Sequence, residues 1–435
     1  MTISQRDQEV IWHPYTQHKM APLPITIQRG EGAWLFDERG NRFLDLISSW
    51  WVNLHGHANR EIANAIHEQA LKLEHVIFSS FTHEPAVLLA EKLLTILPDH
   101  FSKIFYSDNG STSVEVAIKM AYQFWKNKGD KDRHRFIAFQ NGYHGDTFGA
   151  MAIGKKSGFF TAYEGLFFDV DFIQYPSTWM NDADVLKKEQ DILSGLDAHL
   201  KKYAHETAAI ILEPLIQGAS GMRMCRPEFL QQLEKKIRSY GILIIYDEVM
   251  TGFGRTGELF ACSKSATQPD IICMSKGITG GFLPFAATAC TETIYQAFLA
   301  DNFESALVHG HSYTGNPLSC AAALASFDIL QRPETIAQQK MIEQVHIKGL
   351  NYLIKESRVD QVRYCGTVAA FNLKASAEYG SLDSLKLREQ FQKKGLLIRP
   401  LGNVIYLLPP YCIDEKDLEN TYSIMAEEIH GATVC

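Results

Sequence analysis

The sequence has few of the features that mark disulfide-rich, metal-binding or membrane proteins. Its eight cysteines are dispersed, with no Cys-x-x-Cys pair and no Cys/His ligand spacing, so neither a zinc site nor a disulfide framework is indicated. No apolar run approaches membrane-spanning length, and the first residues lack a signal-peptide core. We therefore expect a cytoplasmic protein with no membrane partner.

An excess of positive charge is also absent, since the chain has 42 lysines and arginines against 50 acidic residues. The net charge is −8, and the cluster of basic residues at 126–135 also carries acids, so no basic stripe indicates a nucleic-acid partner. Of the 435 residues, 46% are hydrophobic and 21% are charged, which is ordinary for a globular protein. This length corresponds to roughly two or three domains.

Short apolar runs recur along the chain and end on polar residues. One run, at 242–246, ends on Asp247, and another, at 271–274, ends just before Lys276. Such runs predict strands of a parallel sheet, and ligands bind beyond the carboxyl ends of such strands. An acid and a lysine at this edge suit pyridoxal phosphate (PLP), which takes a lysine Schiff base and an acid at its pyridine nitrogen. Taken singly, Asp247 could be a helix cap and Lys276 a solvated surface lysine.

The segment Gly252-Phe-Gly-Arg-Thr-Gly257 matches the dinucleotide-binding pattern G-x-G-x-x-G. That pattern should follow its strand directly and open a helix, whereas residues 248–251 intervene here and Gly-Glu-Leu-Phe is a weak helix start. We expect a turn-forming loop, and a nicotinamide-dependent dehydrogenase stays a remote alternative.

Two loops carry candidate cofactor contacts. In Asn109-Gly-Ser-Thr-Ser113, between a predicted strand and a helix, Gly110 admits a close ligand and Ser111 adds a hydroxyl beside free N–H groups, as in a phosphate site. The same residues also make a good helix N-cap without any ligand. After the predicted strand at 135–140, Tyr143 could cover a cofactor ring or belong to an ordinary turn.

The regular alternation of strands and helices predicts a doubly wound α/β domain followed by a smaller α+β region. We expect a hairpin at 34–45 and helices at 62–74, 85–97, 318–330 and around 342–355. Because residues 50 and 51 are adjacent tryptophans in a segment read as extended, we expect only one of them to line a pocket. The expected division is an N-terminal segment (1–55) in the small domain and active-site wall, a large domain (56–330) and a C-terminal small domain (331–435).

Several segments together resemble the class III aminotransferases, which are PLP enzymes of fold type I. The resemblance covers nearly the whole chain and implies a mostly parallel seven-stranded sheet flanked by helices, with a small α+β domain built from both termini. It rests on Leu212-Glu-Pro, Tyr246-Asp-Glu-Val, Gly252-Phe-Gly-Arg-Thr-Gly, Ser275-Lys-Gly and His309-Gly-His-Ser-Tyr-Thr-Gly-Asn-Pro. Within this family, Trp12-His-Pro-Tyr15-Thr-Gln, Ser49-Trp-Trp51 and Arg399-Pro-Leu-Gly resemble the branch that acts in biotin synthesis.

The family resemblance implies a role for each cofactor-binding candidate. Lys276 would hold PLP as a Schiff base and then move a proton as acid and base, and Asp247 would keep the pyridine nitrogen protonated. Gly110 and Ser111 would bind the phosphate, and Tyr143 would stack on the ring. These roles suit the residue types at those positions.

The resemblance also implies a homodimer with active sites at the subunit interface. Ser312 would reach the phosphate bound by the neighbouring subunit. In the biotin branch this turn often carries Pro-Thr, and here it carries His311-Ser312, which keeps the hydroxyl.

The resemblance to the biotin branch implies the substrates. The enzyme would convert 8-amino-7-oxononanoate to 7,8-diaminononanoate by a ping-pong transamination, with S-adenosylmethionine, or lysine as in some relatives, as amino donor. Arg399 would clamp the carboxylate of the long keto acid. Further substrate-binding candidates are Tyr15, which also counts with Lys276 and Asp247 as catalytic, and Trp50, Trp51, Gly310 and Tyr406.

Other interpretations stay open at this stage. Another class III transaminase, acting on ornithine, acetylornithine or an ω-amino acid with 2-oxoglutarate, has the same cofactor residues, and a non-catalytic scaffold is a further alternative. Glu213 either neutralises an arginine during one half-reaction or is structural. Arg255 belongs either to the loop architecture, which we favour, or to the active-site wall.

Overall fold

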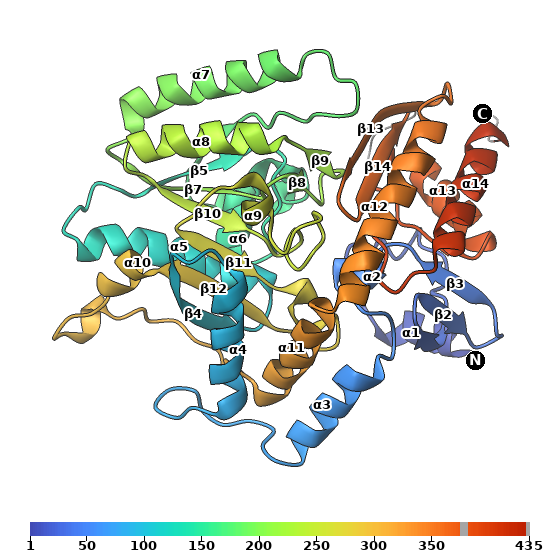
Figure 1. Ribbon diagram of the computed structural model, residues 1–435, viewed down its shortest axis with the longest axis horizontal. Helices are drawn as coiled ribbons and strands as arrows, with labels where there is room; N and C mark the ends of the chain where they lie inside the picture. The colour runs from blue at the N-terminus through green and yellow to red at the C-terminus, as the bar shows by residue number, and fades with distance from the viewer. Residues whose placement is uncertain (375–381, 432–435) are drawn as a thin grey trace.

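A seven-stranded sheet with helices on both faces forms the centre of the larger part of the molecule (Figure 1). The structure, a computed structural model, describes residues 1–374 and 382–431. All neighbouring strands run parallel except β12, which is antiparallel to both of its neighbours. The expected mostly parallel sheet is thereby confirmed. In sheet order the strands are β4 (Phe101–Ser107), β12 (Ala286–Thr291), β11 (Ile271–Met274), β10 (Leu243–Asp247), β7 (Thr207–Leu212), β5 (Arg135–Phe139) and β6 (Val170–Ile173).

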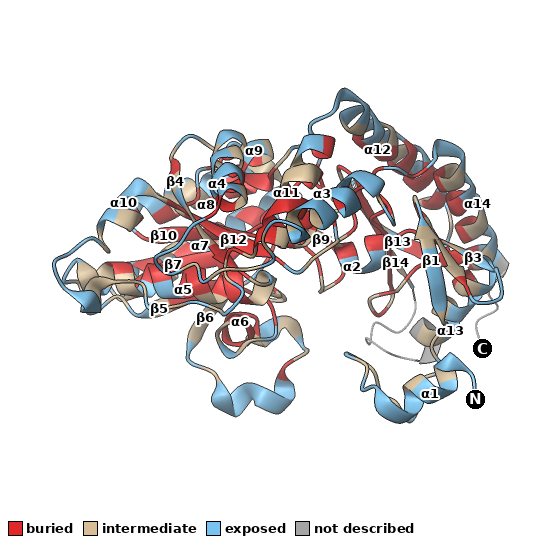
Figure 2. Cartoon of the chain, turned by 90° about the horizontal axis from the view of Figure 1, so that it is seen from below, coloured by how far each residue is buried: buried red, intermediate tan, exposed pale blue. Residues whose placement is uncertain are grey.

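The sequence of β10 is apolar at successive positions, without alternating apolar and polar residues, because both of its faces are buried. Ile244 and Tyr246 belong to the core that includes Phe229 of α8 (Pro227–Ser239), whereas Leu243 and Ile245 belong to the core under α5 (Gly110–Asn127). Both faces of the strand are therefore covered, as expected of a parallel sheet between helical layers. Figure 2 shows the central strands as buried and the outer faces of the helices as exposed.

The predicted strands at 135–140, 208–212, 242–246 and 271–274 agree with the structure to within about a residue at each end. The helices predicted at 85–97 and 318–330 are α4 (Glu84–Ile96) and α11 (Pro317–Leu330). Two helix boundaries were wrong. The helix predicted at 62–74 is α3 (Arg60–Ala70), which ends before residue 74. Beyond its end, the Gln69 side-chain amide donates to the carbonyl of Leu73. Helix α12 (Pro333–Leu353) begins well before residue 342, because Pro333 occupies the first turn, where its missing N–H is not needed.

The N-terminal and C-terminal parts of the chain share a sheet. The predicted hairpin is confirmed as β2 (Trp34–Asp37) and β3 (Arg42–Asp45), with β1 (Ile27–Glu31) beside it. On the other edge β15 (Leu396–Leu397) pairs parallel with β3. This sheet positions the N-terminal segment against residues near 399, although the division at residues 56 and 331 stays a prediction.

The C-terminal region adds a second antiparallel sheet of β13 (Val359–Cys365), β14 (Val368–Leu373) and β16 (Val404–Leu407). Helices α12 and α14 (Glu415–Gly431) lie side by side over it (Figure 1). No described helix combines the length and apolar composition that a bilayer-spanning segment needs. The other helices are α1 (Ile3–Val10), α2 (Ser48–Trp51), α6 (Phe148–Ile153), α7 (Val185–Tyr203), α9 (Ala261–Ser265), α10 (Glu292–Gln296) and α13 (Leu382–Lys393), and β8 (Ile216–Gln217) pairs with β9 (Arg223–Met224).

The contact between α12 and α14 gives a test of packing. A Cβ on Gly349 of α12 would lie 2.3 Å from Tyr422 of α14, so we expect Gly349→Ala to destabilise the protein by about 1–3 kcal/mol. Gly195, in the interior of α7, has no atom within 4 Å of its Cβ position, and Gly195→Ala should stabilise the protein by about 1 kcal/mol through helix propensity. Urea denaturation of both variants checks the signs, and equal shifts would contradict the packing argument.

Candidate active site

The carboxyl ends of β10 and β11 open on a cavity of about 440 Å³, which we call the cofactor cavity. The structure brings all the predicted cofactor-binding residues of this chain except Ser312 to its wall. They are Gly110, Ser111, Tyr143, Asp247 and Lys276, joined by His144, Glu213 and Val249. Neighbouring strands that run parallel end at one edge of the sheet, which is why residues far apart in the sequence meet here.

Lys276 lies two residues after the end of β11 and has a left-handed backbone conformation, with φ 45°. Its Nζ lies 4.5 Å from the centroid of the Trp51 ring. Desolvation lowers the pKa of Lys276 to about 8, although the charges of Asp247 and Glu213 act in the opposite direction. A substantial fraction of this amine is therefore neutral near physiological pH, the form that can act as a nucleophile or a base.

Asp247, at the end of β10, is held by its own hydrogen bonds. Its Oδ2 lies 2.7 Å from Nδ1 of His144, and its Oδ1 accepts from the backbone N–H of Val249 at 3.1 Å. His144 is buried, which disfavours its charged form, but the hydrogen bond to Asp247 and the charges of Asp247 and Glu213 raise its pKa overall. His144, the residue after Tyr143, was not among the predicted site residues, because its contact with Asp247 could not be assigned without the fold.

The start of α5 forms the other end of the cofactor cavity. Asn109 caps the helix, because its side chain accepts from the N–H of Thr112 at 3.1 Å, and this confirms the predicted N-cap. Gly110 and Ser111 provide first-turn N–H groups that have no partner within the helix. A Cβ on Gly110 would lie 2.7 Å from Val249 Cγ1, so only glycine fits there. This is the arrangement that binds a phosphate.

These groups fit PLP. An amine, a carboxylate held by a histidine, the N-terminus of a helix and the ring of Tyr143 line one cavity, and together they form the donor set that this cofactor requires. The individual roles assigned to Lys276, Asp247, Gly110 and Ser111 stay predictions.

A second cavity, of about 310 Å³, adjoins the first at Lys276, Trp51 and Tyr143; we call it the aromatic slot. It collects the substrate-binding candidates Tyr15, Trp50, Trp51, Arg399 and Tyr406. The Trp51 indole N–H donates to the Tyr406 hydroxyl at 3.0 Å, and the Arg399 guanidinium lies 4.7 Å from the Trp50 ring centroid. The slot thus joins a lysine to an arginine between aromatic walls.

The two tryptophans lie together. Trp50 and Trp51 both line the aromatic slot, as the family resemblance implied, although an extended segment would have turned only one of them toward a pocket. The segment is not extended, because α2 is kinked at Ser49 (φ 60°, ψ −78°) and Trp50 (φ −139°, ψ 57°). This irregular backbone turns two adjacent side chains toward one space, and such strain concentrates at functional sites.

Asp146 is a residue of the site that sequence reasoning missed. Its Oδ1 accepts from the Tyr15 hydroxyl at 2.6 Å and from the Tyr143 hydroxyl at 3.1 Å. It thereby joins the N-terminal segment to the loop after β5, which are distant in sequence. Its only sequence signal was its place three residues after Tyr143.

Two predicted residues lie outside both cavities. Gly310 and Ser312, which the structure describes, are exposed in the segment 309–314 and line neither the cofactor cavity nor the aromatic slot. His311 lies 3.7 Å from Asp108, which does line the cofactor cavity, so the segment is near its edge. The role of Ser312 requires a second subunit, and the roles of both residues stay predictions.

Glu213 and Arg255 both bond to the backbone. The Glu213 oxygens accept from the N–H groups of Tyr143 (3.0 Å) and Gly218 (2.9 Å), and burial raises the pKa of Glu213 to about 7. Arg255 is buried and donates to the carbonyls of Asn53 and Pro409, which favours its structural interpretation.

The glycine-rich segment 252–257 forms a series of turns, and the next helix, α9, begins only at Ala261. This confirms the expected turn-forming loop. The segment lacks the helix that a dinucleotide site needs after its glycines.

The fold and the site define a PLP-dependent aminotransferase. The sequence pattern of the class III aminotransferases matches residues 15–429, and the chain belongs to this family. It is 50% identical to the adenosylmethionine-8-amino-7-oxononanoate aminotransferase of Synechococcus elongatus, over 96% of this chain and 97% of that relative. Among solved structures, the aminotransferase of the same name from Methanocaldococcus jannaschii matches with a TM-score of 0.92 and 39% identity over 99% of each chain. An ω-transaminase from Pseudomonas jessenii, in complex with PMP, matches with a TM-score of 0.90 and 26% identity over 99% of this chain and 98% of its own.

The lowered pKa of Lys276 predicts a pH-dependent stability of the cofactor-free protein. Below pH 8 the amine is charged in both folded and unfolded states, and only the folded state bears its desolvation, so Lys276→Met should stabilise the fold at pH 7 by roughly 2–3 kcal/mol. The advantage should fade between about pH 8 and 10.5, where the folded amine is already neutral. Denaturation curves across this range, with the exposed Lys340→Met as control, check the sign. A stability difference independent of pH would contradict it.

Proposed function

We propose that this protein transfers an amino group from S-adenosylmethionine to 8-amino-7-oxononanoate and forms 7,8-diaminononanoate for biotin synthesis. The observation that carries the proposal is the aromatic slot between Lys276 and Arg399. The acceptor is a long aliphatic keto acid with a terminal carboxylate, so it needs an apolar passage with a cation beyond it. Guanidinium binds carboxylate with two parallel hydrogen bonds.

The relatives support the same substrates. Proteins named adenosylmethionine-8-amino-7-oxononanoate aminotransferase match nearly the whole chain at 50% and 38% identity. The ω-transaminase structure shares the fold at 26% identity, so a transaminase that acts on an ω-amino acid is the nearest alternative. The arginine at the end of an aromatic slot favours the keto acid of biotin synthesis.

Different residues of the chain have different roles in the proposed reaction. PLP, when bound, supplies an electron sink that stabilises negative charge at the substrate carbon. Nζ of Lys276 removes the proton from the carbon that bears the amino group and returns a proton in the second half-reaction. Arg399 holds the carboxylate, and the rings of Trp50 and Trp51 exclude water from the aliphatic chain. The bond from Tyr15 to Asp146 holds the N-terminal wall in place.

The proposal includes a homodimer in the cytoplasm. Ser312 would contact the phosphate held by Gly110 and Ser111 of the neighbouring subunit, and Gly310 would complete that subunit's substrate site. The exposed segment 309–314 near Asp108 is suitably placed for such a contact.

The absorption spectrum tests the cofactor and the donor together. We expect the protein loaded with PLP to absorb visible light, and the band to bleach when S-adenosylmethionine is added. Lys276→Ala should lose the band of the wild type and all measurable turnover, since it lacks the amine that binds PLP and moves the proton. If the band does not bleach with S-adenosylmethionine but does bleach with lysine or ornithine, the proposal that S-adenosylmethionine is the amino donor is wrong.

Steady-state kinetics test the carboxylate clamp. Arg399→Ala should raise KM for 8-amino-7-oxononanoate by at least about tenfold, because a charged hydrogen-bonded pair is lost. Arg29→Ala, which removes an exposed arginine paired with Glu31, is the control. An unchanged KM in Arg399→Ala, or activity of the wild type with 2-oxoglutarate in place of the keto acid, would refute this assignment.

A further inference from the structure

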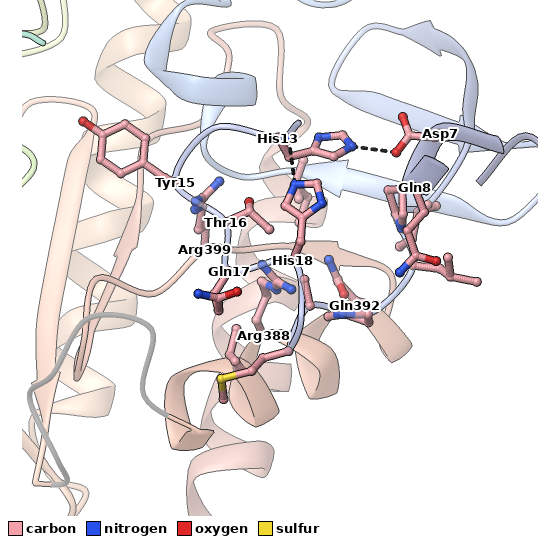
Figure 3. Close-up of a pocket in the computed structure, with 18 of the residues that line it drawn as sticks. Asp7, Gln8, His13, Tyr15, Thr16, Gln17, His18, Arg388, Gln392 and Arg399 are labelled. Carbon is pink, nitrogen blue, oxygen red and sulfur yellow. Dashed lines mark hydrogen bonds and ion pairs between the residues drawn. The ribbon is translucent and has the colours of Figure 1, made fainter. Parts of the chain in front are cut away.

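A third cavity, of about 600 Å³, lies between residues 7–27 and residues 385–400 (Figure 3). We call it the N-terminal cavity. Tyr15 and Arg399 line both this cavity and the aromatic slot, so the two spaces adjoin at these residues. Since Lys276 lines the slot and the cofactor cavity but not the N-terminal cavity, the three spaces follow one another from the lysine past Arg399.

The two proposed substrates differ in size, and the aromatic slot and the N-terminal cavity differ correspondingly. The keto acid is a narrow chain, and the slot of about 310 Å³ with Arg399 at its far side suits it. S-adenosylmethionine carries a ribose and a purine beyond its sulfonium, and binding sites enclose most of a ligand's surface. With its amino group at Lys276 and its sulfonium beside the rings of Tyr15 and Trp50, its bulky end has to lie beyond the slot.

We propose that the N-terminal cavity binds the adenosyl group of the amino donor. This inference rests on the proposed function and assigns a separate part of the site to the donor alone. The acceptor ends at Arg399 and does not enter the cavity, whereas the donor passes Tyr15 and occupies it.

The lining of the cavity suits a purine nucleoside. Gln17 and Gln392 are amides, and an amide pairs with the N6 and N7 edge of adenine through two hydrogen bonds. His18 and Arg388 present planar groups of the kind that stack on bases. The remaining wall is largely apolar and suits the purine faces; it includes Met20, Pro22, Leu23, Leu385 and Leu397.

Hydrogen bonds within the N-terminal segment shape this lining. His13 Nε2 lies 2.7 Å from Asp7 Oδ2, and the backbone N–H of His13 donates to Nε2 of His18 at 2.9 Å. Figure 3 shows His13 and His18 on the loop that also carries Tyr15, while Asp7 lies on α1. The loop that closes the slot therefore also builds the cavity, which gives the donor a direct contact with the wall of the reaction site.

Kinetics with separate donor and acceptor titrations of the PLP-loaded enzyme test the proposal. Gln392→Leu removes the amide but keeps much of its volume, and we expect it to raise KM for S-adenosylmethionine about tenfold, with KM for 8-amino-7-oxononanoate unchanged. Gln390→Leu is the matched control, because Gln390 lies on the same helix, is exposed and does not line the cavity. Ala21→Trp fills the cavity from its opposite wall and should affect the donor in the same direction.

Calorimetric titration with adenosine gives a readout that does not depend on turnover. We expect adenosine to bind the wild type and the Gln390→Leu control with equal affinity. It should bind Gln392→Leu about tenfold more weakly, and binding to Ala21→Trp should be lost. No adenosine binding by the wild type, or equal affinities in all variants, would overturn the proposal, as would equal changes in KM for both substrates.

The failure of the proposed function is distinguishable from the failure of this inference. If S-adenosylmethionine does not bleach the wild-type cofactor band but 7,8-diaminononanoate, the product, does, then the donor is wrong and the acceptor is right. The N-terminal cavity would then have no adenosyl donor to bind, and both the proposed donor and this inference would be wrong. If S-adenosylmethionine does react and the variants leave its KM unchanged, the inference alone fails.

Discussion

Desolvation of the Lys276 amine is the constraint on which the rest of the site depends. An ammonium group removed from water loses hydration, and the nearby charges of Asp247 and Glu213 compensate for this only in part, so the pKa of the lysine falls to about 8. That enclosure requires the ring of Trp51 on one side and the ends of β10 and β11 on the other. The left-handed backbone at Lys276 and the kink at Ser49 are tolerated because the packed structure around them holds both segments in place.

The cofactor cavity depends on the seven-stranded sheet, and the aromatic slot depends on the sheet that the N-terminal and C-terminal parts of the chain share. Asp247, Tyr143, Glu213 and Lys276 all lie at or just beyond strand ends, so the sheet alone brings them together. Arg399 and Tyr406 reach the slot through β15 and β16, and Tyr15 and Trp50 reach it from the other end of the chain. The pairing of β15 with β3 joins these two contributions. This division matches the comparisons, since an ω-transaminase from Pseudomonas jessenii shares the fold at 26% identity.

The proposed donor and the proposed acceptor place different demands on one site. Both would present a carbon to Lys276, yet one is a narrow chain with an anionic end and the other is a cation with a nucleoside attached. A slot followed by a wider cavity would allow both without movement of the walls, because the spaces adjoin at Tyr15 and Arg399. Specificity of this kind arises from the additional contacts of the larger ligand rather than from exclusion of the smaller one.

The sequence by itself determined the strands and the chemistry at their ends. Continuous apolar runs such as 242–246 and 271–274 predict buried strands because side chains on both faces are covered, and the residues that follow such runs lie at the ligand-binding edge. Gly110, Ser111, Tyr143, Asp247 and Lys276 could therefore be predicted to lie at this edge before the fold was known. Only the tertiary structure decided the contact of His144 with Asp247, the link of Asp146 to Tyr15 and Tyr143, and the presence of both Trp50 and Trp51 in one slot. These depend on segments more than 100 residues apart and on an irregular backbone at Ser49, and neither long-range contacts nor strained dihedral angles leave a periodic signal in a sequence.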